Sequence, residues 1–194
     1  MIQPGVPIDW GDFPLFPKEF ILPLERFYAH LLGLTALLTQ PNINPALTSI
    51  SLHPLARRQI LNRLELKGTA QWGLLLGERR GEHLQVRFIL PAGQWHPSIS
   101  PFTAWNTLYL LGASEALTPL CDSATDWYGV WVIQPNSHLP PVATDLTLAE
   151  EAQKHGLLND QHPLLSMGWM DGILTVQAYK YMDEITLVSL PVTP

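Results

Sequence analysis

The sequence predicts one mixed α/β (α+β) domain, residues 47–194, in which helices flank a mixed β-sheet. Three observations support this class. From Thr48 onward, short stretches with strand-like apolar patterns alternate with stretches of helical periodicity. A chain of 194 residues, 46% of them hydrophobic, is long enough for one well-filled core. Residues 1–46 differ in composition, because they contain repeated prolines, which restrict the backbone.

The composition excludes several classes of partner and location. The net charge is -6 and the 11 Lys and Arg residues do not cluster, so we expect no nucleic-acid partner. Cys121 is the only cysteine, which rules out an intrachain disulfide and favours a reducing compartment. The N-terminus has no signal-peptide pattern, and no apolar run is long enough to cross a bilayer. We therefore expect a cytoplasmic protein without a membrane partner.

The N-terminal region, residues 1–46, combines an extended proline-spaced arm with one helix. Between Pro23 and Pro41, apolar side chains recur near helical spacing, which predicts an amphipathic helix. The arm before it carries four large aromatic residues. We expect these to be covered by the domain or by a neighbouring molecule. The aromatic residues are Trp10, Phe13, Phe16 and Phe20.

The first half of the domain reads as strand, helix and hairpin. Ser49–Leu52 alternates like a strand, and Pro54 suits the first turn of a helix that runs to about Leu66. The hairpin is predicted from two apolar runs that flank a polar turn at 79–82. Its strands are Gln71–Glu78 and His83–Leu90. The side chains that we expect to face inward from the helix are Leu55, Ile60, Leu61 and Leu64.

The second half begins with a predicted helix over Phe102–Leu117 and a strand over Trp127–Gln134 that is apolar enough to be buried on both faces. Thr147–Glu150 fits a capping box, so a short helix should start there and end near Gly156. Three strands follow, with an Asp-Gly turn between the first two. Their predicted bounds are Pro163–Trp169, Ile173–Tyr181 and Ile185–Pro191.

Three stretches together resemble the JAB/MPN (JAMM) metalloprotease family, which has a cytidine-deaminase-like fold. The opening strand and helix of that family are similar to SISLHPLARRQILNRLEL, and its second strand is similar to QWGLLLGERRGEHLQV. The segment that carries the metal ligands, with the helix after it, is similar to WYGVWVIQPNSHLPPVATDLTLAEE. The resemblance implies the JAB/MPN fold for 47–194 and leaves the N-terminal region outside it.

The resemblance also implies that the metal site of the family has been lost. Active members bind zinc through a His-x-His pair and an Asp, and those positions here are Val132, Gln134 and Asp145. The general base corresponds to Ala70 and the serine that stabilises the oxyanion to Val142. Catalytic zinc needs three protein ligands and an open position for water, and four of these five side chains cannot serve. We expect no bound metal, no cofactor and no catalytic residue, and a structural role for Asp145 beside a helix start.

Other residue patterns give weaker functional hypotheses. His138, with His96, His155 and His162, could form a substitute metal site, although no paired spacing supports one. Ser137 beside His138 is an unpromising nucleophile and base, because neighbours on an extended chain point apart. Gly73-x-x-x-Gly77 lacks the Lys of a phosphate loop. The tryptophans are expected to be core or groove residues, with one or two free to anchor a partner.

The functional prediction is a non-catalytic JAB/MPN-like module that acts by protein–protein contact. Inactive members of the family pair with active ones, build scaffolds or contact ubiquitin-like proteins, so the resemblance implies a protein partner and a homo- or heterodimer. Two alternatives stay open at this point. One is a divergent zinc metallopeptidase or isopeptidase. The other is a small-molecule binding domain, which predicts an apolar pocket lined by Ala70, Val132, Gln134 and Val142.

Overall fold

A computed structural model describes residues 45–66, 68–95, 102, 106–117, 125–181, 185–188 and 192–193. In chain order the described elements are β1 (Ser49–Leu52), α2 (Pro54–Leu64), β2 (Ala70–Arg80), β3 (His83–Trp95), α3 (Thr107–Leu117), β4 (Asp126–His138), α4 (Val142–Lys154), β5 (Leu164–Met170), β6 (Ile173–Tyr181), β7 (Ile185–Val188) and β8 (Val192–Thr193). The predicted N-terminal arm and helix lie outside the described residues.

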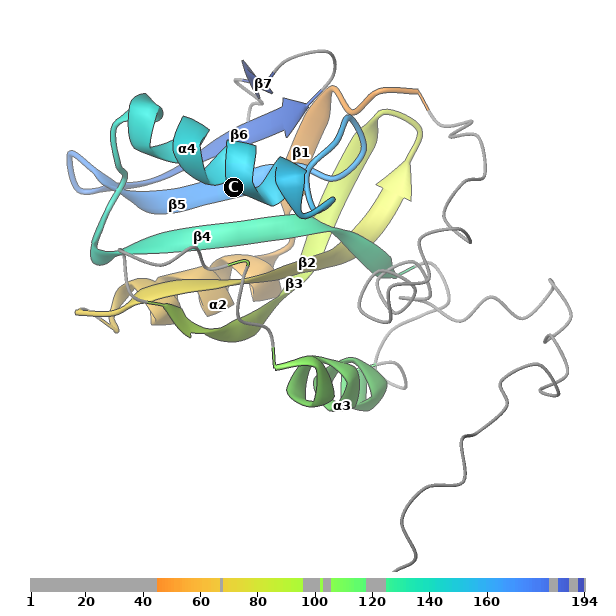
Figure 1. Cartoon of the computed structure of the whole chain (residues 1–194), viewed down its shortest axis with the longest axis horizontal. Coiled ribbons are helices and arrows are strands. Elements are labelled where there is room, and N and C mark those ends of the chain that lie inside the picture. Colours follow the sequence, from red (N-terminus) through yellow and green to blue (C-terminus); the bar gives the residue numbers. More distant parts are fainter. Residues whose placement is uncertain are drawn as a thin grey trace, which may run out of the picture.

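The strands form one mixed sheet in the order β7-β6-β5-β4-β2-β3-β1-β8. The pairs β4–β5, β1–β3 and β1–β8 are parallel, and the other neighbours are antiparallel. The chain crosses from β4 to β5 through helix α4, and from β1 to β3 through helix α2 and strand β2, since a parallel pair needs a crossover connection. Helix α2 packs on one face of the sheet and α4 on the other (Figure 1). The predicted mixed α/β class is therefore confirmed.

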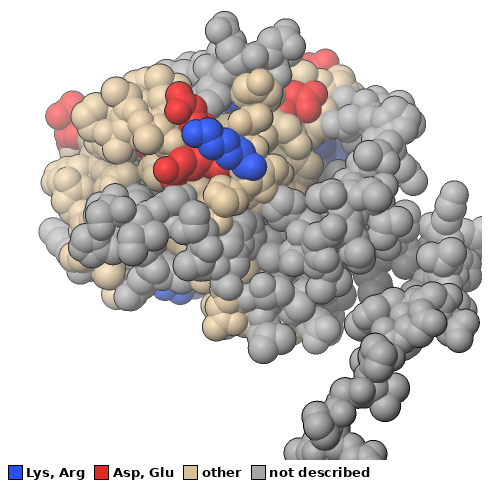
Figure 2. Space-filling view, viewed as in Figure 1, with Lys and Arg blue, Asp and Glu red and all other residues tan. Residues whose placement is uncertain are grey.

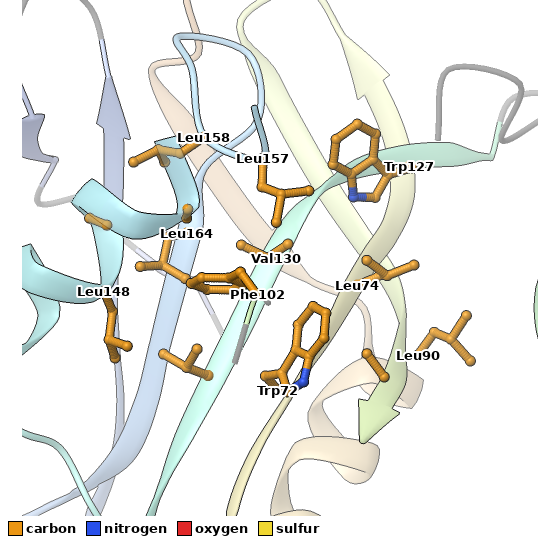
Figure 3. Packing of buried hydrophobic residues seen from close by; sticks show 14 of the residues in the cluster. Trp72, Leu74, Leu90, Phe102, Trp127, Val130, Leu148, Leu157, Leu158 and Leu164 are labelled. Carbon is orange, nitrogen blue, oxygen red and sulfur yellow. The ribbon is translucent and has the colours of Figure 1, made fainter. Parts of the chain in front are cut away.

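Each face of the sheet has its own hydrophobic cluster, because successive residues of a strand point to opposite faces. On the α4 side lie Trp72, Val130 and Val132, together with Leu148 from the helix itself. Trp72 packs edge-on against Phe102 (Figure 3). On the face of α2 lie Trp131 and the other side chains of the second cluster. Strand β4 thus contributes to both clusters, and the continuous apolar pattern at its centre follows from burial on both sides.

The hairpin of β2 and β3 is built around two glycines that the sequence places four residues apart. The register between the strands shifts between Trp72 and Gly73, and again between Leu76 and Gly77. A Cβ atom at Gly73 would lie 2.0 Å from the Leu90 carbonyl oxygen, and one at Gly77 would lie 2.2 Å from the carbonyl oxygen of Gln85. Only glycine fits so close to a neighbouring backbone, so the Gly-x-x-x-Gly spacing belongs to two β-bulges.

Several predicted boundaries and orientations were wrong. Helix α2 ends at Leu64 and buries Ala56 where Leu55 was expected, because Leu55 is 37% exposed. Helix α3 begins at Thr107, after Asn106 accepts a hydrogen bond from the Tyr109 amide at 2.9 Å. The short strand β8 was not predicted, and it pairs with β1 at one edge of the sheet.

The largest difference between prediction and structure is the start of helix α4. It starts at Val142, five residues before the predicted capping box, and the Pro141 carbonyl accepts from the Thr144 amide at 2.9 Å. Two successive prolines at 140 and 141 hold the chain extended up to that point. Thr147 lies inside the helix, where its hydroxyl donates to the Ala143 carbonyl at 3.2 Å. The predicted end is confirmed, since Lys154 is the last helical residue and Gly156 has a φ of 70°.

The remaining strand predictions hold to within a few residues. Strands β5 and β6 match their predicted ranges, and Asp171 and Gly172 form the turn between them with φ angles of 52° and 76°. Positive φ at both central residues is the geometry of a tight hairpin turn. Among the described residues, no helix is long and apolar enough to cross a membrane.

The bulges predict a large effect for Gly73→Ala. The added methyl group meets the Leu90 carbonyl, so we expect the free energy of unfolding to fall by about 1–3 kcal/mol. Gly112→Ala is the matched control, because no atom lies within 4 Å of its Cβ position in helix α3. That control should gain about 0.5–1 kcal/mol from helix propensity. Urea unfolding followed by tryptophan fluorescence measures both, and equal effects would contradict the bulge interpretation.

Candidate functional site

Most of the positions that the family resemblance assigned to a lost metal site lie on the α4 side of the sheet. Val132, in β4, lies in register with Trp72 on β2 and with Ser166 on β5. Gln134 follows two residues later on the same face by strand alternation, and Ala70 precedes Trp72 by the same spacing. Four of the five positions therefore share one face: Ala70, Val132, Gln134 and Asp145. Val142, at the first residue of α4, is 38% exposed.

Asp145 is completely buried in the first turn of α4. It occupies the position one turn before Leu148 and Ala149, and two turns before Ala152, all of which are buried. This is the i, i+3, i+4, i+7 stripe with which a helix covers a core. A carboxyl group thus occupies the first position of the apolar stripe. Asp145 lies near a helix start, as expected, but inside the first turn of α4 and not before it; the cap position is Pro141, which makes no side-chain cap hydrogen bond.

Ser166 and Tyr179, from β5 and β6, lie beside this carboxyl group, and Gln177 contacts Tyr179. The Tyr179 hydroxyl donates to Oδ2 of Asp145 at 2.9 Å and lies 2.9 Å from Oε1 of Gln177. Ser166 is in register with both Val132 and Gln177, so it lies between them in the same row of the sheet. We call Asp145, Ser166, Gln177 and Tyr179 the Asp145 cluster.

The cluster is incompletely hydrogen-bonded. Oδ1 of Asp145 and Oγ of Ser166 are buried without a direct partner, although Ser166 is close enough to lower the pKa of the carboxyl group. Nε2 of Gln134 is also buried and unpartnered. Buried polar atoms without partners are rare in native proteins, and they gather where a structure serves something other than stability. The Asp145 cluster, with Gln134 beside it in the sheet, is therefore a candidate site on physical grounds alone.

Burial raises the pKa of Asp145 from the ordinary 3.8 to about 6, against the lowering effect of the neighbouring Ser166 and Tyr179 hydroxyl groups. Burial and the neighbouring Asp145 charge also raise the pKa of Tyr179, whose phenol therefore stays protonated as a donor. At neutral pH the carboxylate is ionised in an apolar environment. Such a group can hold a proton near neutrality or stabilise one cation, but it has no second carboxylate or imidazole within the cluster to share a catalytic step.

The described residues do not assemble a metal site. They contain no group of three His, Cys, Asp or Glu side chains placed to hold an ion. Val132 has no lone pair and is fully buried in the hydrophobic cluster. The substitute histidines are dispersed: His138 is exposed at the end of β4, and His162 stacks on Trp127 at the start of that strand with ring centroids 4.5 Å apart. His96 lies outside the described residues.

Other polar residues singled out by the sequence support helix α2 instead of the site. The Gln71 amide donates to the carbonyl oxygens of Arg63 and Leu66 at 3.1 and 3.3 Å, and the Ser137 hydroxyl donates to the Leu64 carbonyl at 2.7 Å. These bonds satisfy carbonyl groups at the end of the helix that have no partner within it. Ser137 is buried and His138 is exposed, which confirms that the two do not form a pair.

A pocket among the described residues lies elsewhere. It has a volume of about 370 Å³ and lies between α2 and β3. Its lining combines Gln59, Asn62, Arg63 and Leu66 with two residues of β3. None of the four positions named for a small-molecule cleft contributes to it, and Val132 and Ala70 are packed as core residues.

The sequence alone did not identify Ser166, Gln177 and Tyr179 as site residues. A usable signal was present, because Ser166 is the one polar side chain in the buried stretch Leu164–Gly168. A second signal was the helical spacing of Asp145 with Leu148, Ala149 and Ala152, which places the carboxyl group in the buried stripe. Neither signal shows which residues meet across the sheet.

Comparison with known proteins gives the fold but no activity. No protein-family model matches the chain, and no curated protein matches it. Among solved structures, the chain is similar to protein DSY2949 from Desulfitobacterium hafniense, determined in solution. The match has a TM-score of 0.51 at 15% identity and covers 74% of this chain and 92% of that one. The name of that protein states no activity, so this likeness concerns the fold alone.

The buried carboxyl group predicts an unusual pH dependence of stability. A folded-state pKa above the unfolded value means that the folded state binds the proton more tightly, so stability falls as pH rises from about 4 to about 6. The full difference corresponds to about 3 kcal/mol. Asp145→Asn, which stays neutral, should therefore be more stable than the natural chain at pH 7.5 by about 1–3 kcal/mol and no more stable at pH 4.

Urea unfolding at both pH values measures this effect. Glu150→Gln on the same helix is the matched control, because Glu150 is exposed and its substitution should leave the pH profile unchanged. An unchanged profile in Asp145→Asn would show that the carboxyl group does not titrate differently in the folded state.

Proposed function

We propose that this chain is a non-catalytic JAB/MPN-like module that works through protein–protein contact. The order of its described elements supports the family resemblance: strand, helix, hairpin, helix, buried strand, helix and strands. The placement of Ala70, Val132, Gln134 and Asp145 on the same side of the sheet supports it further, because these positions are far apart in the chain. A cytoplasmic location is part of the same proposal and rests on the single cysteine.

The burial of Val132 is the main observation that supports a non-catalytic role. This side chain lies where the first histidine ligand is expected, and it is fully enclosed in the hydrophobic cluster under α4. Asp145, the one remaining ligand position, is hydrogen-bonded to Tyr179. A single carboxylate with an amide nearby cannot replace the three ligands of a catalytic zinc ion.

An exposed apolar tip supports the role in protein contact. Met170 and Ile173, paired across the β5–β6 hairpin, are 50% and 68% exposed, and Val142 at the start of α4 is 38% exposed. The Leu139 amide donates to the Trp169 carbonyl at 3.1 Å, which brings the loop before α4 to the same end of the sheet. We call Val142, Met170 and Ile173 the apolar tip. On the face seen in Figure 2, charged side chains gather around α4, and much of the other described surface is uncharged.

Restoring the two histidines tests the assignment of the lost site. Val132→His with Gln134→His places two imidazoles beside Asp145, and we expect this double variant to bind zinc with a Kd of about 1 μM or tighter, since three ligands then converge. The natural chain should bind no stoichiometric zinc. Competition with a chromogenic chelator measures both affinities.

The control is the same double variant carrying Asp145→Asn, which should lose at least about tenfold in affinity because a charged ligand is gone. Circular dichroism establishes that each variant is folded. Folded double variants that bind no zinc, or bind it equally well without Asp145, would refute the assignment. Stoichiometric zinc in the natural chain would favour the metallopeptidase alternative.

The apolar tip predicts association. We expect the purified chain to form a homodimer at micromolar concentration, or to form a stoichiometric complex with a partner protein. Ile173→Asp should weaken either association at least about tenfold, because it places a charge in an apolar contact. Leu55→Asp is the control, since Leu55 is also exposed but lies on α2. Light scattering gives the mass in each case, and a monomeric natural chain that recovers no partner from cells would count against the proposal.

A further inference from the structure

The pocket between helix α2 and strand β3 combines a polar wall with an apolar one. It lies on the face of the sheet opposite α4 (Figure 1). Its volume of about 370 Å³ is at the lower end of the range for ligand pockets, about 300–1,000 Å³. The polar side chains of its lining all carry hydrogen-bond donors: Gln59, Asn62 and Arg63. The remaining lining residues are apolar: Leu66, Ile89 and Pro91.

The backbone of β3 orients the Gln59 side chain. Oε1 of Gln59 accepts a hydrogen bond from the Ile89 amide at 2.9 Å. A backbone N–H can donate only to the oxygen of a carboxamide, so this bond fixes which end of the side chain is which. The NH₂ group of Gln59 is then the end that can donate to a ligand. Asn62, one residue before Arg63, is exposed and adds a second amide donor.

Arg63 gives the pocket a positive charge. It is the one charged residue among the described residues that line the pocket, and no described carboxylate forms an ion pair with it. Helix α2 also carries Arg57 and Arg58 and has no acidic residue, although the whole chain has a net charge of -6. A positive region on an acidic protein attracts anions, and a guanidinium group matches the geometry of a carboxylate with two parallel hydrogen bonds.

The backbone that carries Arg63 and Leu66 is held in place by the sheet. The Gln71 amide, from β2, donates to the carbonyl oxygens of both residues. The Ser137 hydroxyl, from β4, donates to the carbonyl of Leu64 between them. This wall of the pocket is therefore ordered before a ligand arrives, which lowers the entropy cost of binding. Leu66 itself is 52% exposed, so an apolar surface is available beside the guanidinium group.

We propose that this pocket binds a carboxylate group that is joined to an apolar chain. The guanidinium group of Arg63 pairs with the carboxylate, Gln59 and Asn62 donate to it, and the apolar chain packs against the wall that contains Leu66. A single arginine suits a carboxylate with one charge better than a phosphate group, which carries nearly two at neutral pH. The pocket is separate from the Asp145 cluster and from the apolar tip, so this inference does not rest on the proposed function.

Two sources of such a carboxylate are distinguished by titration of the full chain, followed by NMR of its amide groups. One probe is 4-methylpentanoate, a free acid, and the other is acetyl-alanyl-alanyl-leucine, a peptide with a free C-terminus. We expect the corresponding amides to bind at least about tenfold more weakly than the acids, because they lack the charge. The tighter of the two acids identifies the source.

Three results of this titration would overturn the proposal. The first is amides that bind as tightly as the acids. The second is inorganic phosphate that binds more tightly than either acid. The third is the absence of binding by both acids at concentrations up to about 10 mM, which is weaker than a specific pocket of this size requires.

Substitution of Arg63 tests the residue that holds the carboxylate. Arg63→Gln keeps much of the side-chain length and removes the charge, so both acids should bind at least about tenfold more weakly while the amides are unaffected. Arg58→Gln is the matched control, because it removes the same charge from an exposed position of α2 outside the pocket. That control should change the affinity less than about threefold. Equal losses in the two variants would show a general charge effect and overturn the site, and urea unfolding establishes that both are folded.

Discussion

The burial of β4 on both faces is the constraint on which the rest of the structure depends. Val130 and Val132 face α4, and Trp131 and Ile133 face the cluster beneath α2. A strand in this position must be apolar at every residue, since each side chain is removed from water. The same requirement explains the aliphatic side chain of Val132, which is fully buried among the residues of the cluster on the α4 side.

The Asp145 cluster is the exception to this apolar interior. A carboxyl group at 0% exposure is held by Tyr179 through a bond between residues 34 positions apart in the chain, and one of its oxygens has no direct partner. Desolvation opposes its charge and raises its pKa to about 6. The ionised form of Asp145 destabilises the folded protein at neutral pH, so stability does not explain why a carboxyl group is present here. Within the proposed function, the carboxyl group is inherited from a metal site that needed it.

The apolar tip lies where the loop before α4 meets the β5–β6 hairpin, and its side chains Val142, Met170 and Ile173 are exposed. Within the proposed function, this end of the sheet is where a partner protein would dock.

The sequence by itself determined the mixed α/β class, most strands and the Asp-Gly turn, because strand alternation, helical period and turn chemistry are local. It also shows that Val132 and Ala70 offer no lone pair and that Gln134 offers only an amide, which is a poor zinc ligand. Only the tertiary structure decided that α4 begins after Pro141, that Asp145 is buried, and that Ser166, Gln177 and Tyr179 surround it. Those facts depend on which strands become neighbours, and strand order is a property of the whole fold.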